Sequence, residues 1–282
     1  MVDSSEDLWN LDQVHDLIER DPAAGGREAV EKIVNDVRAI TDKISEDAEK
    51  IISSVNVDAE VTAAKLKAEA KEAADTIREN AAKAASDLIA NVKEGEDPKS
   101  AAIIAKKILQ QAQNNTAELN RRADESIKAM IDQAEAAAFK FQRVAEAGAR
   151  KMAQLREQAT KKLADTTRDM AAKFLDSKDG TEDKDGRHAA AEIIKMLAQA
   201  SEEVHLAATE ATAKIQEVAE EAIVTAKEAA RDAAASVEGA IGDANKRMLE
   251  VTQTTITQTV GAKEAEFYDV GSLRDKMKNR VV

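Results

Sequence analysis

The chain has 282 residues and a formal net charge of −13, with no cysteine, two prolines, one tryptophan, one tyrosine and four phenylalanines. So few aromatic residues disfavour a sheet-based core, and the abundance of alanine, glutamate and lysine favours helix. The acidic balance argues against a nucleic-acid partner, and the missing cysteines exclude a disulfide framework or a thiolate metal site.

Residues 1–25 are predicted to form a short amphipathic helix followed by a hinge. Ser4 or Ser5 can cap the helix. The pairs Asp21-Pro22 and Gly25-Gly26 predict the hinge. The acidic start lacks the basic region of a secretory signal, and no apolar run is long enough to span a membrane. We therefore expect a cytoplasmic protein, with peripheral binding to a surface still open.

Large apolar residues recur every eleven positions along three segments, which are predicted to be long helices over 26–94, 98–175 and 187–260. Eleven residues make three helical turns at about 3.67 residues per turn, so these residues share one helix face. We call them the ladder residues. They are Ile33, Ile44, Val55, Leu66, Ile77, Leu88, Ile108, Leu119, Met130, Phe141, Met152, Leu163, Phe174, Ile193, Val204, Ile215, Val237 and Met248.

Within the three segments, the positions four and seven residues after the ladder residues are mostly alanine, and Arg156 is the one charged residue among them. We expect the Arg156 stem to pack while its guanidinium reaches solvent. The alternative is an ion pair that sets the register of the helices.

The segments have near-equal lengths and are separated by short breaks, at Gly95–Pro98 and at 176–186. This pattern predicts an all-α fold, an antiparallel up-down-up, rod-like coiled-coil bundle with eleven-residue periodicity. The alternative is that the breaks only kink the chain, which would then extend and pair between subunits.

The third helix has a further apolar stripe, three residues after each ladder position, where the first helix carries acids and asparagines. The stripe consists of Met196, Ala207, Val218, Ala229, Ala240 and Val251. Two interpretations stay open: deeper burial inside the bundle, or a seam that joins two copies of the chain. The seam would make the protein associate with itself, because soluble monomers rarely expose such a patch.

The acidic loop predicted over 176–186 continues into a stretch that resembles the twelve-residue calcium loop of EF-hands. Asp183, Asp185 and Glu192 fall at the third, fifth and twelfth positions of that loop. The first position holds Thr181 in place of an acid, so we expect no functional calcium site. The other interpretation is a polar turn with acids near the start of a helix.

Half of the aromatic residues lie outside the three long segments. The predicted terminal docking residues are Leu8, Trp9, Leu11, Phe267 and Tyr268. The last two belong to a tail over 261–282 that ends in basic residues. These segments either cap the bundle or bind another copy or another protein.

No catalytic motif, cofactor-binding loop or paired metal ligands occur, so we expect neither an enzyme nor a cofactor. The pattern favours a structural, self-associating coiled-coil protein that forms a filament, scaffold or spacer. The stretches KAEAKEAADTIRENAAKAA and TAKEAARDAAAS look like the repeats of late-embryogenesis-abundant proteins, and the composition is similar to that of phasins. These resemblances imply an alternative: an amphipathic, stress-protective or coat protein that covers a lipid or polymer surface.

Overall fold

A computed structural model describes residues 16–18, 20–92, 98–176 and 182–260. Almost all of these residues are helical, and no strand occurs among them. Three long helices contain them: α3 (Pro22–Ala90), α4 (Pro98–Asp176) and α5 (Glu182–Val260). The all-α class predicted from the sequence is therefore confirmed.

None of the helices, over the residues described, is apolar for long enough to cross a membrane.

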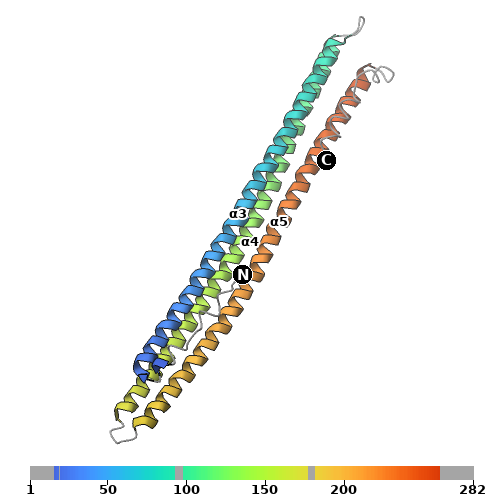
Figure 1. Cartoon of the computed structure of the whole chain (residues 1–282). Coiled ribbons are helices and arrows are strands. Elements are labelled where there is room, and N and C mark those ends of the chain that lie inside the picture. Colours follow the sequence, from blue (N-terminus) through green and yellow to red (C-terminus); the bar gives the residue numbers. More distant parts are fainter. Residues whose placement is uncertain (1–15, 19, 93–97, 177–181, 261–282) are drawn as a thin grey trace. The chain divides into compact units, whose positions relative to one another are not determined.

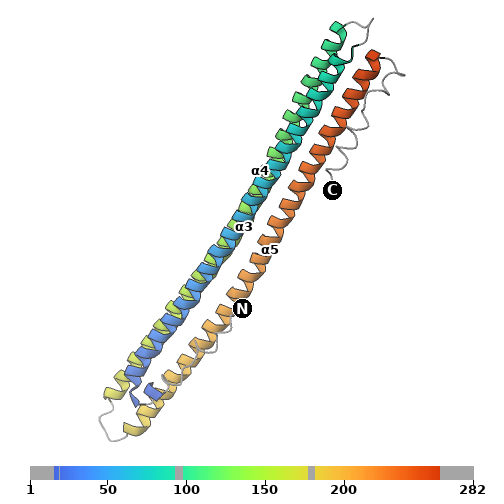
Figure 2. The ribbon, with the colours of Figure 1, turned by 45° about the horizontal axis from the view of Figure 1, so that its top comes forward.

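The chain divides into two compact units, and every long helix contributes a part to each unit. Unit 1 combines residues 1–54 with 137–222, and unit 2 combines 55–136 with 223–282. Within each unit, segments of all three helices pack against one another (Figures 1 and 2).

The direction of the helices follows from which residues share a buried cluster. In unit 1, one cluster joins Ile33, Leu163 and Ile193, and the next joins Ile44, Phe141 and Ile215. The residue numbers rise along α3 and α5 while they fall along α4. In this unit α4 therefore runs antiparallel to the other two helices. Unit 2 has the same order, since its clusters join Leu66, Met130 and Val237, then Ile77, Leu119 and Met248.

Every ladder residue whose side chain is described lies in the core, with at most 8% of its surface exposed. The side chain of Phe174 lies outside the described part. Alanines fill the spaces around the ladder residues, for example Ala48, Ala145 and Ala219 around Phe141. Side chains this small let helix axes approach closely, but each buries little apolar surface, so stability must accumulate over many layers.

The extra stripe of α5 is not an exposed seam, and that interpretation is corrected. Ala207, Val218, Ala229 and Ala240 are buried at 4% or 5% exposure, each in a cluster that includes residues of α3 and α4. Met196 and Val251, at the two ends of the stripe, are half-buried. The stripe faces the other helices of its own chain.

The physical reason is that the helices bury different flanks of their ladders. On α3 the flank eight residues after the ladder positions is buried at Ala74 and Ala85, which are 1% and 4% exposed, and half-buried at Thr41, Ile52 and Ala63. On α5 the buried flank lies three residues after. When α3 and α5 are both compared three residues after their ladder positions, α5 therefore seems to have the wider apolar face. Each helix in fact contacts two neighbours.

The predicted hinge at Gly25-Gly26 is wrong, because α3 begins at Pro22 and contains both glycines. Asp21 caps this helix: its Oδ1 accepts a hydrogen bond from the backbone N–H of Ala24 at 3.0 Å. Proline is favoured at the first position of a helix. The glycines serve close packing, because a Cβ added at Gly25 would lie 2.5 Å from the Cα of Ile18.

The loop predicted over 176–186 is shorter than expected, since α5 begins at Glu182. Asp183, Asp185 and Glu192 therefore lie in a helix rather than in a calcium-binding loop of the EF-hand kind. Acids are favourable in a first helical turn, and this preference explains the early start. Thr181 lies outside the described residues.

A few polar groups are buried within this alanine-rich packing. Asp36, at a position where the ladder pattern puts acids in solvent, is 8% exposed, and its burial raises the pKa of the carboxyl against the opposing effect of Lys32. Asn115 Nδ2 and Ser201 Oγ are buried and have no hydrogen-bond partner among the residues that the structure describes. Such groups cost free energy in the folded state.

We predict that Val218→Glu strongly destabilises the folded chain. The carboxylate would enter a buried cluster without a partner, at a cost of about 3 kcal/mol or more. Val224→Glu is the matched control, because Val224 lies six residues further along α5 and is 51% exposed. Urea denaturation followed by circular dichroism measures both; similar free energies of unfolding for the two variants would contradict the packing described for α5.

We also predict opposite effects for two Gly→Ala substitutions within helices. Gly25→Ala should destabilise by about 1–3 kcal/mol, because the new methyl group would overlap the backbone of Ile18. Gly242→Ala should stabilise by about 0.5–1 kcal/mol, because open space surrounds that position and alanine has the higher helix propensity. Thermal denaturation of the two variants tests this, and a stabilised Gly25→Ala protein would restore the hinge interpretation.

Candidate functional site

Two openings lie between α4 and α5, one in each unit. We call the opening in unit 1 the groove, with a volume of about 680 Å³, and the opening in unit 2 the notch, with about 450 Å³. The groove is lined by Phe139, Lys140, Arg143, Val144, Ala147, Gly148, Lys151, Glu210, Ala211 and Lys214. The notch is lined by Arg122, Glu125, Ser126, Ala129, Ser236, Gly239, Ala240 and Asp243.

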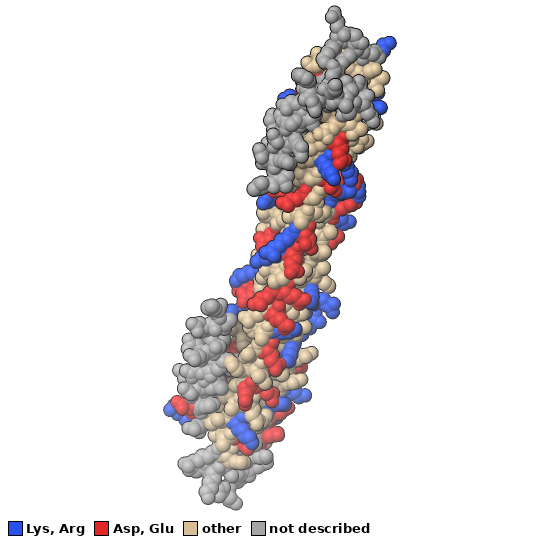
Figure 3. Space-filling view, turned by 90° about the vertical axis from the view of Figure 1, so that its right-hand side faces the viewer, with Lys and Arg blue, Asp and Glu red and all other residues tan. Residues whose placement is uncertain are grey.

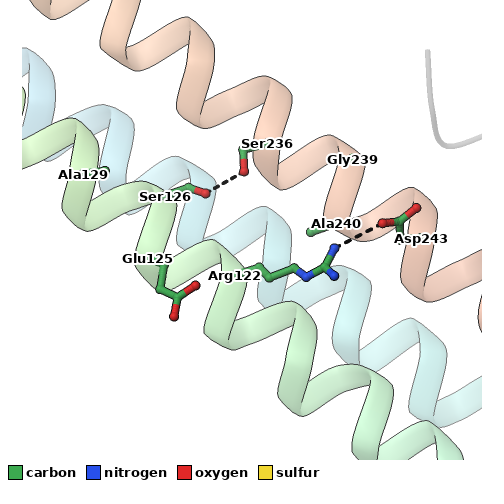
Figure 4. A pocket seen from close by; sticks show the side chains of 8 residues that line it. All are labelled: Arg122, Glu125, Ser126, Ala129, Ser236, Gly239, Ala240 and Asp243. Carbon is green, nitrogen blue, oxygen red and sulfur yellow. Dashed lines mark hydrogen bonds and ion pairs between the residues drawn. The ribbon is translucent and has the colours of Figure 1, made fainter.

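The notch is bridged by polar contacts between the two helices. The hydroxyl oxygens of Ser126 and Ser236 are 2.7 Å apart, and Arg122 Nη1 donates to Asp243 Oδ2 at 3.1 Å (Figure 4). The Arg122 guanidinium points from α4 across to α5, and so it spans the opening instead of facing an empty space. The small residues Gly239 and Ala240 leave room for it.

The charges beside the notch neutralise one another. Glu118 accepts hydrogen bonds from Arg121 at 2.7 Å and from Arg122 at 2.9 Å, and Arg121 also donates to Glu125 at 2.6 Å. The hydrogen bonds from Arg121 and then from Arg122 lower the pKa of Glu118 to about 2. Every charge that lines the notch has a partner among the described residues, so the notch is a polar crossing between α4 and α5.

The groove has a different character, because it combines apolar surface with cations. Phe139, which lines the groove, is 61% exposed. Gly148 lets α4 and α5 come close together, because a Cβ added at this position would lie 3.3 Å from Ile215 Cδ1. An exposed phenylalanine beside a concave surface is a common feature of binding sites for apolar groups.

Three of the groove's four cations are paired. Lys140 donates to Glu221 at 2.7 Å, Lys151 to Glu210 at 2.9 Å and Lys214 to Glu217 at 2.6 Å. Arg143 forms no ion pair or hydrogen bond with any described residue. The groove therefore contains one guanidinium that no described residue engages, four residues from Phe139 along α4, in a chain whose net charge is −13.

Elsewhere the visible surface mixes both signs of charge. Lysine and arginine side chains alternate with aspartate and glutamate along the face drawn in Figure 3. Several are paired within one helix, as Arg150 is with Glu146 at 3.0 Å. Solvent-exposed pairs of this kind contribute about 0–1 kcal/mol each and keep the surface hydrated.

Within the described ranges, no group of three or more histidine, cysteine, aspartate or glutamate side chains could hold a metal ion. Arg156 is half-buried and pairs with no acid in that part of the chain, so the register-setting ion pair is not found there. The terminal docking residues Leu8, Trp9, Leu11, Phe267 and Tyr268 lie outside the described residues.

Neither opening was predicted from the sequence. Gly148, an isolated glycine inside a helical pattern, and Phe139, a large apolar residue off the ladder, are the two signals that point to the groove. The notch gives no such signal, because Arg122 and Asp243 become neighbours only through the register of α4 on α5.

Comparison of the chain with models of protein families, with curated proteins and with solved structures finds no match.

We predict that Glu118 stays ionised to unusually low pH. Its pKa of about 2 lies below the ordinary 4.5, so the ionised form stabilises the fold above pH 4.5 and this contribution is lost as the pH falls toward 2. NMR titration of the carboxyl carbon measures the pKa directly. In Arg121→Gln the pKa of Glu118 should return toward 4.5, while Lys106→Gln, twelve residues before Glu118 in α4, should leave it unchanged. A midpoint near 4.5 in the unmodified protein would contradict the geometry described.

Proposed function

We propose that this chain is a structural protein, a spacer or scaffold whose long helices form a three-stranded coiled coil with eleven-residue periodicity. The supporting observation is that each of the four buried clusters includes residues of α3, α4 and α5. The ladders of one chain cover one another, so no second chain is needed to bury them.

Copies of the chain cannot associate through the stripe of α5, because that stripe is buried within its own chain. A filament or scaffold would therefore use surfaces outside the core. We propose the segment 261–282, which carries Phe267 and Tyr268, as the contact between copies. A cytoplasmic location belongs to the same proposal, because a chain without cysteine suits a reducing compartment.

The surface supports a structural role more than a catalytic one. The described carboxyl groups with shifted pKa values are those of Asp36, Glu46, Glu118 and Glu221. For the last three, the main cause is a hydrogen bond from a lysine or arginine at the surface, and the Asp36 carboxyl lies 3.9 Å from Lys32 within the packing of unit 1. None of the four lines either opening, where a substrate would bind.

The rival function is a coat that covers a lipid or polymer surface with helices that open on binding. A spacer should be fully helical in plain buffer and should melt cooperatively, whereas a coat should gain helix only when lipid vesicles or trifluoroethanol are added. Circular dichroism with and without vesicles separates the two. A flat melting curve, with helicity that rises on vesicles, would overturn the structural proposal.

Deletion of 262–282 tests the proposed contact between copies. We expect the truncated chain to keep its helicity and melting temperature but to form smaller assemblies by light scattering and negative-stain microscopy. The matched control replaces residues 262–282 with a glycine–serine linker of equal length. Unchanged assembly in both variants would assign the contact to another surface.

A further inference from the structure

We propose that α5 has a second register on α4, shifted by eleven residues toward the turn that joins these two helices. A helix advances about 1.5 Å per residue, so the shift moves α5 by about 16 Å along its axis. Eleven residues make close to three turns, and α5 therefore keeps the same face toward its neighbours. The proposal goes beyond the spacer role, because the movement of one helix along another gives a protein two distinct states.

The first argument is a column of acids on α5 that repeats with the same spacing of eleven residues. Its members are Glu210, Glu221, Asp232 and Asp243. The first, second and fourth of them accept hydrogen bonds from Lys151 at 2.9 Å, from Lys140 at 2.7 Å and from Arg122 at 3.1 Å. Asp232 forms no ion pair or hydrogen bond with any described residue. The column thus contains one acid that the observed register leaves unused.

The shift moves each acid into the place of the preceding member of the column. Lys151 and Lys140 therefore keep an acid opposite them, and Asp232 gains a partner. Arg122 loses its acid, because no acid follows Asp243 at the next position of the column. Exposed ion pairs each contribute little to stability, so this exchange leaves the two registers close in electrostatic free energy.

The second argument is the buried amide of Asn115, whose Nδ2 has no hydrogen-bond partner among the described residues. The hydrogen bond between the two serines of the notch shows which residues of α4 and α5 face each other. Eleven residues from this bond on both antiparallel helices, Asn115 lies level with position 247, and so within one turn of Ala244 and Met248. Both are apolar and buried. After the shift, Thr255 and Thr259 take their places, and a threonine hydroxyl can accept the hydrogen bond that Nδ2 lacks.

The third argument is that the start of α5 can take up the length. Helix α5 begins at Glu182, although the sequence pattern also suits a loop over 176–186. Residues 182–186 are four charged residues and a glycine, a composition typical of turns. Unwinding of 182–192 releases the eleven residues that the shift requires. The opposite shift has no such source, because only five residues separate α4 from α5.

Disulfide trapping in the full chain tests the proposal directly, because the chain has no cysteine of its own. Ser126→Cys is combined in turn with a cysteine at one of three positions of α5. Ser236→Cys reports the observed register and should cross-link within one chain. Arg247→Cys lies eleven residues, or about 16 Å, further along α5, so it should cross-link only through the shifted register. Thr225→Cys is the matched control, equally far in the opposite direction, and should not cross-link.

A charge substitution then measures the balance between the two registers. Asp232→Lys places a lysine beside Lys140 in the shifted register only. It should therefore lower the rate of the 126–247 disulfide about threefold or more and leave the 126–236 disulfide unchanged. Glu228→Lys is the matched control, since it makes the same charge change one turn earlier on α5, outside the column of acids. Circular dichroism checks that all variants remain folded.

Three outcomes would overturn the proposal. The chain with Arg247→Cys could cross-link no faster than the chain with Thr225→Cys. Asp232→Lys and Glu228→Lys could change the rate of the 126–247 disulfide equally, and fraying of the helices would then explain the cross-link. The 126–247 disulfide could join two chains and disappear on dilution, so that the contact would lie between copies instead of within one chain.

Discussion

The packing of alanine around the ladder residues is the constraint on which the other features of each unit depend. Helices whose contact faces consist mainly of methyl groups can approach closely, and each ladder side chain then fills the space between three helices. The cost is that every layer contributes little apolar area. A substitution that adds one methyl group at a close contact, such as Gly25, or one charge in a layer, such as at Val218, therefore disturbs a large share of the local packing.

Both openings contain a glycine, but the two glycines are placed differently. A Cβ added at Gly239 of the notch would meet nothing within 4 Å, whereas one added at Gly148 of the groove would lie 3.3 Å from Ile215 Cδ1. What occupies the space differs. In the notch, Arg122 and Asp243 span the space from opposite helices. In the groove, the long side chains of Lys140 and Lys151 pair with acids on α5, and the apolar floor around Val144 and Ala147 stays open.

Much of the fold could be predicted from the sequence because its signal is periodic. The spacing of eleven residues identified the buried residues from Ile33 to Met248 without any knowledge of the partner helices. The flank that each helix buries could not be predicted in this way, because it depends on the direction of the neighbouring helices. For that reason the choice between burial and a seam stayed open for Val218, and the burial of Asp36 was not predicted. The hinge was placed wrongly at Gly25-Gly26, because these glycines serve close contacts inside α3, whereas the helix is interrupted at Asp21, directly before Pro22. The groove depends on how far α4 is shifted along α5, and this register cannot be read from a single sequence.

The buried polar atoms without partners have a consequence for how the helices open. In the folded state, Asn115 Nδ2 and Ser201 Oγ have no hydrogen-bond partner among the described residues. Both atoms can form hydrogen bonds with water when a few helical turns separate. The free energy of local opening is then lower around these two residues than around Phe141 or Ile193, which bury only apolar surface. Within the interior of the helices, amide hydrogens near positions 115 and 201 would exchange faster than those near Phe141 and Ile193. Long helices of otherwise uniform composition would thus acquire defined places at which they open.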